Sequence, residues 1–219
     1  MKKAMININE ERKKDIQAMS DPRNVRQEFK GFSLEECQSY CQKDRLPFDA
    51  CFLNLTSDLN VSASIRTLHL LGVDTIYILG KKKLDRRALV GAEFYSNLQF
   101  LGGLQYDDFS IDENVFLNML SMHEDYFPIF VEMGGINLTS IDWKNILQKN
   151  DNTLYRPLLI YGNENRGIGK NILKLCEKLP RSIIVSIPML GVLRSLNVSA
   201  SVAISSWDLI KNIYTEKIL

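Results

Sequence analysis

The strongest constraint on the fold is an alternation between short apolar runs and amphipathic helical stretches, which begins near residue 50. Apolar runs of this length are typical of buried strands, and apolar residues with a period near 3.6 are typical of helices. The strand candidates are 50–55, 74–79, 127–132, 157–161 and 181–187, and the clearest helical stretches are 62–71, 142–149 and 195–214. This order predicts parallel strands joined by crossover helices in an open α/β sheet. The segment 80–125 gives no clear prediction.

The N-terminal part of the chain has a different texture. Residues 1–45 are charged and helical in pattern, and the second of two helical segments opens at Ser33 with Glu36 at capping-box spacing. The densest group of basic residues in the chain precedes residue 31: Lys2, Lys3, Arg12, Lys13, Lys14, Arg23, Arg26 and Lys30. Such a group is either a solvated helical face or an extension that contacts RNA. We therefore expect a helical extension over 1–46 and one larger domain over 47–219.

The balance of charged residues excludes a strong electrostatic field over the whole protein surface. The 27 Lys and Arg residues nearly cancel the 26 Asp and Glu residues, so any surface that binds nucleic acid must be local. No apolar run approaches the roughly 18 residues that span a membrane. Charged residues between Glu10 and Asp15 interrupt any apolar segment of a secretion signal. We expect a cytoplasmic protein that does not contact a membrane.

The cysteines do not form a metal-binding pattern. Cys37, Cys41, Cys51 and Cys176 contain no C-x-x-C pair, and neither of the two histidines is near them in sequence. Buried thiols are the expected state. No metal site is predicted.

Three polar segments follow predicted strands, where ligands bind in open α/β sheets. The first, 60–67, places Arg66 inside the first turns of a helix, where a guanidinium either faces a phosphate or a developing alkoxide or simply lies on the surface. The second, 162–170, is a glycine-rich turn. Gly162 and Gly167 have the spacing of a phosphate loop, but Ile168 and Gly169 stand where lysine and a hydroxyl residue are required.

The second segment also fails the dinucleotide fingerprint, because Gly167-x-Gly169 lacks the third glycine. It remains a loop that lets a ligand approach the backbone, with Glu164 at its tip. The third segment, 186–199, reads as a strand end, a turn at Pro188 and Gly191, and a helix that opens between Ser195 and Asn197. A helix start suits a ligand rich in acceptors or negative charge, although a plain strand–loop–helix joint with a serine N-cap has the same pattern.

In this order, the three segments resemble the motifs of the SpoU-TrmH family of SPOUT RNA ribose 2'-O-methyltransferases. The first motif resembles 60–67, the second 162–167 and the third 187–199, and the resemblance covers roughly 50–214. It implies a SPOUT methyltransferase domain over 47–219, with a parallel sheet flanked by helices and a C-terminal deep trefoil knot. Such a knot is an exception to the usual rule that chains are unknotted.

The resemblance also implies a cofactor, a site and an assembly. Family members bind S-adenosylmethionine in the knot loops and are homodimers with the site near the interface. The implied cofactor contacts are Tyr161, Gly162, Ile187, Met189, Ser195 and Leu196. The implied catalytic or RNA-positioning residues are Asn60, Arg66, Glu164, Ser195 and Asn197.

The predicted activity is methyl transfer to a ribose 2'-hydroxyl of structured RNA. Family proposals make the motif-one arginine the base, but a guanidinium does not normally lose its proton in a protein. We expect Arg66 to stabilise the forming alkoxide while an RNA phosphate accepts the proton. The N-terminal extension resembles that of tRNA-modifying members, which favours tRNA over rRNA. The alternatives are a non-catalytic knotted RNA-binding protein and a SPOUT enzyme that methylates a base.

Overall fold

The computed structural model describes residues 20–81, 84–105 and 110–218. Residue 218 is described by its backbone only. Five of the eight basic residues of the N-terminal group lie outside these ranges: Lys2, Lys3, Arg12, Lys13 and Lys14. The same holds for most of the first predicted helical segment.

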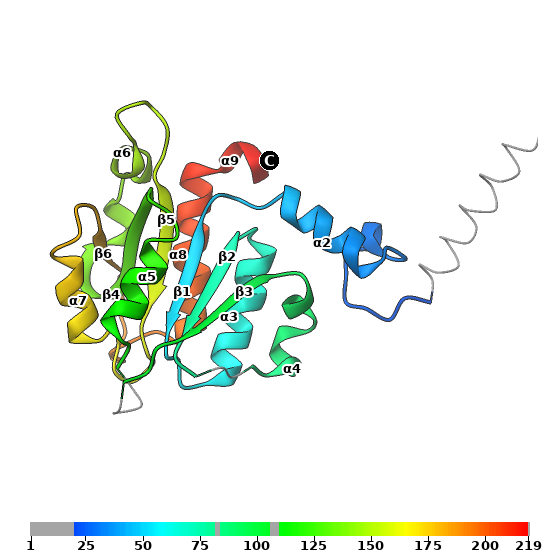
Figure 1. The fold of residues 1–219 in the computed structure, drawn as a ribbon, viewed down its shortest axis with the longest axis horizontal. Coiled ribbons are helices and arrows are strands. Elements are labelled where there is room, and N and C mark those ends of the chain that lie inside the picture. The colour runs from blue at the N-terminus through cyan, green and yellow to red at the C-terminus, as the bar shows by residue number, and fades with distance from the viewer. Residues whose placement is uncertain (1–19, 82–83, 106–109, 219) are drawn as a thin grey trace, which may run out of the picture.

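A six-stranded parallel sheet organises the chain, in the order β3-β2-β1-β5-β4-β6 (Figure 1). The strands are β1 Asp49–Leu53, β2 Thr75–Leu79, β3 Asn97–Gly102, β4 Tyr126–Asn137, β5 Arg156–Tyr161 and β6 Ile183–Ser186. The predicted α/β class is confirmed, and each predicted strand occurs. The additional strand, β3, falls in the segment that gave no prediction, because it lies at the sheet edge and is only partly buried.

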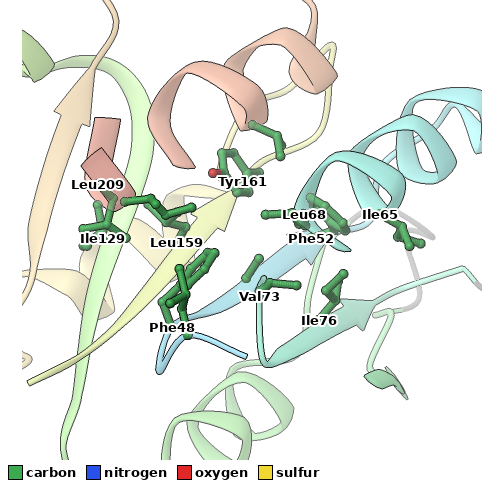
Figure 2. Close-up of a cluster of buried hydrophobic side chains, with 14 of the residues drawn as sticks. Phe48, Phe52, Ile65, Leu68, Val73, Ile76, Ile129, Leu159, Tyr161 and Leu209 are labelled. Atoms are coloured by element: carbon green, nitrogen blue, oxygen red, sulfur yellow. The ribbon is translucent and has the colours of Figure 1, made fainter. Parts of the chain in front are cut away.

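Each face of the sheet has its own hydrophobic core, because side chains alternate along a strand. One core contains Phe52 and Leu159 from the strands and packs under α3 (Asp58–Leu70), α6 (Trp143–Leu147) and α8 (Val198–Ile213); Figure 2 shows its central side chains. The other contains Cys51 and Phe130 and packs under α5 (Glu113–Leu120) and α7 (Lys170–Cys176). The sheet is thus covered by helices on both sides.

Helix boundaries differ from the prediction at two motifs. Helix α3 begins at Asp58 rather than residue 62, because the Ser57 side chain accepts a hydrogen bond from the backbone N–H of Asn60 and caps the helix. Helix α8 begins at Val198, with Asn197 as its N-cap, so the prediction that it opens at Ser195 is wrong. The Asn197 side chain accepts from the backbone N–H of Ser199, which sets the helix start. Ser195 belongs to the preceding loop.

The N-terminal extension contains η1 (Gln27–Phe29) and α2 (Leu34–Lys43), and the predicted capping box at Ser33 and Glu36 is confirmed. Helix α2 stands to one side of the sheet (Figure 1), and its Gln38 amide donates to the backbone carbonyl of Phe94, 2.7 Å away. The remaining short elements are α4 (Arg86–Leu89), η2 (Ala92–Phe94), η3 (Leu138–Ser140) and α9 (Thr215–Ile218).

A buried ion network joins the amino ends of the strands. The Arg156 guanidinium donates to both Asp49 carboxylate oxygens at 2.7 and 2.9 Å and also contacts Asp74. Tyr126 donates its hydroxyl to Asp49 at 2.6 Å. Burial, followed by the Asp49 charge, raises the pKa of Tyr126. This network lies at the opposite edge of the sheet from the three polar segments.

The cysteines are free thiols; Cys37, Cys51 and Cys176 are buried and Cys41 is half-buried. Within the described ranges, no cluster of His, Cys, Asp and Glu side chains is suited to hold a metal ion. In the same ranges, no helix has the length and apolar character needed to cross a membrane.

Candidate active site

Glu164 joins the second polar segment to the first. Its carboxylate accepts hydrogen bonds from the backbone N–H groups of Thr56 and Ser57, at 2.7 and 3.1 Å. The Asn60 amide, in the first turn of α3, also donates to this carboxylate at 2.9 Å. The loop after β5 is therefore fastened to the β1–α3 turn through one side chain.

Asn60 extends this contact to the third segment. Its Oδ1 atom accepts from the Asn197 amide at 3.0 Å, while its own amide nitrogen donates to Glu164. The Oδ1 atom of Asn197 is used as the cap of α8. Asn197, Asn60 and Glu164 therefore form one directed chain of hydrogen bonds that joins three segments far apart in sequence.

These contacts determine the charge state of Glu164. Partial burial by itself raises the pKa of this carboxyl group, but the hydrogen bonds from Asn60, Thr56 and Ser57 outweigh it and lower the pKa below its ordinary value of 4.5. Glu164 is therefore an ionised acceptor at neutral pH. A carboxylate with a lowered pKa is a weak base, so the geometry suits orientation rather than proton abstraction.

The glycine-rich loop is held in a tight conformation. The backbones of Asn163 and Gly167 pair at 3.0 and 2.8 Å, and the Asn163 amide donates to the carbonyl of Asn54 and to the Thr56 hydroxyl. A Cβ atom on Gly162 would lie 2.3 Å from backbone atoms of Gly167 and Ile168. Only glycine fits at position 162.

Glu132 supports the same loop from β4. Its carboxylate accepts from the backbone N–H of Ile168 at 2.7 Å, and a Cβ atom on Gly167 would lie 2.5 Å from it. Gly167 also has a positive φ of 67°, which glycine adopts without strain. Glu132 thus fills the position that any side chain at 167 would need.

A cleft of about 560 Å³ opens beside these contacts, between the ends of β4, β5 and β6. All six residues expected to contact the cofactor line it: Tyr161, Gly162, Ile187, Met189, Ser195 and Leu196. A volume of this size suits a nucleoside-sized ligand. Gly162 and Gly167 expose backbone groups to it, and the site therefore fits a ligand held largely by the main chain.

The third segment forms one wall of the cleft as an open loop. Ser195 and Asn197 are exposed rather than buried, and the Arg194 guanidinium contacts the carbonyl of Asn165 at 3.5 Å. Leu190, Val192 and Leu193 point their apolar side chains into solvent, with exposed fractions of 104%, 101% and 78%. Such a cluster of exposed apolar side chains beside a cleft is typical of a surface that another molecule covers.

Arg66 lies apart from the hydrogen-bond chain. It is exposed on α3, six residues after Asn60, which corresponds to about 9 Å along the helix axis and about 120° around it. It lines a second cleft rather than the one that contains Glu164. Within a single copy of the protein, the fold thus brings together Asn60, Glu164 and Asn197. Ser195 lies nearby, whereas Arg66 does not.

Sequence reasoning assigned no role to Glu132 or Asn163. Glu132 is the last residue of a predicted strand, so its place at a carboxyl end was a usable signal. Asn163 lies inside the second motif, and its tie to Asn54 depends on a left-handed turn at that residue (φ 48°). No sequence pattern predicts that turn.

Comparison with known proteins identifies the family. The model of the SpoU rRNA methylase family matches residues 50–207, which include all three polar segments. The chain belongs to the SpoU family. The family is one of RNA methylases, and this confirms the resemblance found in the sequence. A search of the curated proteins found no match.

Solved structures of SpoU and TrmH proteins share the fold. The TrmH/SpoU tRNA-modifying enzyme of A. aeolicus superposes with a TM-score of 0.60 at 18% identity, covering 84% of this chain and 85% of that one. AviRb of Streptomyces viridochromogenes, a SpoU methyltransferase in complex with AdoMet, gives 0.57 at 19% identity, covering 78% and 59%. A structure titled for 2-OH methylation of C/U34 on tRNA gives 0.55 at 18% identity, covering 78% and 99%. This SpoU chain therefore has their α/β fold.

Proposed function

We propose that this SpoU protein transfers a methyl group from S-adenosylmethionine to a ribose 2'-hydroxyl of RNA. The observation that carries the proposal is the hydrogen-bond chain Asn197–Asn60–Glu164, which joins all three motifs at the edge of a nucleoside-sized cleft. The contacts join polar residues from all three motifs beside the cleft, as a site that binds and orients a substrate requires. They argue against the non-catalytic alternative.

The cleft provides for the cofactor mainly through backbone and apolar groups. Tyr161, Gly162, Ile187 and Met189 would hold it from the ends of β5 and β6, and Ser195 and Leu196 would close over it. When bound, S-adenosylmethionine supplies an activated methyl group. Alignment of that group with the attacking oxygen contributes much of the rate, so a rigid loop is required. Glu132 and Asn163 provide that rigidity.

The proposed catalytic group for the ribose is Arg66. Its guanidinium stays protonated and stabilises the negative charge that forms on the 2'-oxygen, while an RNA phosphate accepts the proton. Because Arg66 does not line the cleft of its own chain, the proposal includes a homodimer in which Arg66 of one copy serves the cleft of the other. The exposed Leu190, Val192 and Leu193 give such a dimer an apolar surface to cover.

The finer features expected from the family complete the proposal. They are a deep trefoil knot in the C-terminal part of the chain, a division into a 1–46 extension and a 47–219 methyltransferase domain, and a cytoplasmic location. The loops after β5 and β6 line one cleft together with residues 131–134 of β4, which is the arrangement that the two knot loops would require. The resemblance of the extension to that of tRNA-modifying members favours tRNA as substrate, and the presence of both Arg66 and Asn197 favours ribose over base chemistry by analogy with the family.

The test is incubation of the protein with labelled S-adenosylmethionine and total tRNA or rRNA, followed by mapping of the modified nucleotide. Label on a 2'-oxygen of tRNA is the expected result. Label on a base would contradict ribose methylation and support a SPOUT enzyme that methylates a base. Label in rRNA alone would contradict the preference for tRNA. No transfer to either RNA, while the protein still binds S-adenosylmethionine, would support the non-catalytic alternative.

A further inference from the structure

A second cleft, of about 900 Å³, lies between the N-terminal extension and the outer surface of the sheet domain. Its walls come from η1 and α2, from the second half of α3, from the 89–95 segment around η2, and from the C-terminal parts of α8 and α9. It shares no lining residue with the first cleft. It is thus a separate feature that involves the extension.

The charge of this cleft differs from that of the whole chain. Five cationic side chains line it, against the single carboxylate of Asp44: Arg26, Lys43, Arg45, Arg66 and Lys217. The complete chain has a net charge of only +1. The positive charge is therefore concentrated here, as a local binding surface for a polyanion requires.

Part of this charge is not neutralised by neighbours. Arg45 pairs with Asp74 at 3.4 Å and Arg26 pairs with Glu28 at 3.2 Å. Lys43, Arg66 and Lys217 make no ion pair within the part of the chain that the structure describes. These three cations come from α2, α3 and α9, and all three line the same cleft.

Aromatic rings stand among the cations. Tyr40 and Trp207 line the cleft with 42% and 51% of their surfaces exposed. His69 and Tyr95 lie with ring centroids 6.0 Å apart, and burial, followed by the nearby Arg45 charge, lowers the pKa of His69. His69 is therefore a neutral ring at pH 7. Cations that track a phosphate backbone, interleaved with exposed rings on which bases stack, are typical of sites for unpaired nucleic-acid strands.

We propose that this second cleft binds an unpaired segment of the RNA substrate, with Lys43 and Lys217 on phosphates and Tyr40 and Trp207 as stacking surfaces for bases. This inference rests on the proposed function for the identity of the ligand as RNA. Arg66 lines the same cleft, so a strand held there passes the arginine that the first motif supplies. The extension then has a defined role: it forms one wall of the strand-binding site.

The charge test compares two double variants of equal charge change. Lys43→Glu/Lys217→Glu alters the cleft, whereas Lys174→Glu/Lys178→Glu alters exposed positions on and just after α7, outside both clefts. The probe is a labelled single-stranded oligoribonucleotide of about 12 nucleotides, bound at several salt concentrations. The cleft variant should bind roughly 10- to 100-fold more weakly, with a salt slope lower by about 1.4, because each lost phosphate contact lowers the slope by about 0.7 on a single strand. Equal binding by the two double variants overturns the proposal.

The stacking test uses tryptophan fluorescence. The chain contains two tryptophans, of which Trp143 is buried and Trp207 is exposed in the cleft. The oligoribonucleotide should quench the emission of the full-length protein, and Trp207→Phe should remove that quenching while binding persists. Tyr40→Ala should weaken binding about 5-fold or more, and Tyr40→Phe should restore it. No quenching on saturation with RNA overturns the assignment.

Two further measurements separate this inference from its alternatives. If a second copy of the chain occupies the cleft, Lys43→Glu/Lys217→Glu changes the mass by light scattering and leaves RNA binding unchanged, which overturns the proposal. Failure of the proposed function is seen instead as absence of methyl transfer by the unaltered protein. RNA binding that depends on Lys43 and Lys217 supports the cleft in either case.

Discussion

At the residue scale, the site depends on the two-sided chemistry of the asparagine amide. Asn60 donates to a carboxylate through Nδ2 and accepts from Asn197 through Oδ1. Neither aspartate nor leucine, which are similar in size, can do both. The side chain therefore transmits the position of Glu164 to the start of α8.

Asn60→Asp places a second carboxylate about 2.9 Å from Glu164 in place of a donor. Two like charges at this distance cannot both remain ionised without cost, so the hydrogen-bond chain should break. We expect a loss of about 1–3 kcal/mol in the free energy of unfolding and a much larger proportional loss of methyl transfer. Thermal melting and turnover measure the two effects. Asn118→Asp adds the same charge on the exposed surface of α5 and should change neither; equal effects of the two variants would refute the role of Asn60.

Glu164 should make the free energy of unfolding depend on pH in the acidic range. Because its pKa is lowered on folding, its contribution is fully present above its ordinary pKa of 4.5 and is lost as the pH falls through the lower folded value. The urea midpoints of the unaltered protein and of Glu164→Gln should therefore differ by a constant amount above pH 5 and converge below 4.5. In an Asn60→Ala background, which lacks one hydrogen bond to the carboxylate, Glu164→Gln should change the urea midpoint by a smaller amount above pH 5, and the convergence should be complete at a higher pH. A constant difference down to pH 3 would contradict the lowered pKa.

At the residue level, the spatial grouping of side chains could be predicted from the sequence where the signal is local to a strand end. Asn60, Glu164 and Asn197 each follow a strand, and parallel strands bring their carboxyl ends to one edge. The hydrogen bonds among them could not be predicted, since they depend on the turn at Asn54 and on the cap of α8. The exposure of Arg66 on another side of α3 depends on where that helix begins, and the prediction began it four residues late.

At the element scale, the fold was predictable where strands are buried on both faces. Such strands read as continuous apolar runs, as in β1 and β5, whose residues are almost all buried. In the edge strand β3 no residue is fully buried, and the strand has no such run. Helices α5 and α7 have eight and seven residues, and both pack on the second core; helices this short offer few repeats of a sequence period.

The ion network at the amino ends of the strands should be a major determinant of stability. Asp49 is fully buried, so Arg156→Met leaves a desolvated carboxylate without its cation. Removal of one partner of a buried pair typically costs about 3–5 kcal/mol. Urea unfolding should show this loss, whereas Lys211→Met, at the exposed pair with Asp208, should cost about 1 kcal/mol or less. Similar losses in the two variants would mean that Asp49 is hydrated in solution. At 25 °C the folded Arg156→Met protein should still bind S-adenosylmethionine, because the network lies at the far edge of the sheet.

At the scale of the whole molecule, the separation of Arg66 from Glu164 is the main constraint on mechanism. The two side chains line different clefts of one chain, although both belong to the proposed catalytic set. A homodimer resolves this separation if each cleft receives the arginine of the other copy. A monomer offers no such arrangement without movement of α3, which packs closely against α8 in the first core.

Mixed dimers distinguish an Arg66 that acts across the dimer interface from one that acts within its own chain. Arg66→Ala and Glu164→Gln should each be inactive alone, because each removes one group from every site. If Arg66 acts across the interface, a dimer of one Arg66→Ala chain and one Glu164→Gln chain contains one cleft with both groups intact. Random exchange of subunits makes half of the dimers mixed, so an equimolar mixture should recover about a quarter of the unaltered activity. If Arg66 acts within its own chain, every cleft of the mixed dimer lacks one group and no activity returns. Activity is measured after the subunits are exchanged in mild denaturant and refolded, with each variant treated alone as the control. Recovery establishes the dimer and the position of Arg66 together, since no monomeric arrangement allows two inactive chains to complement each other.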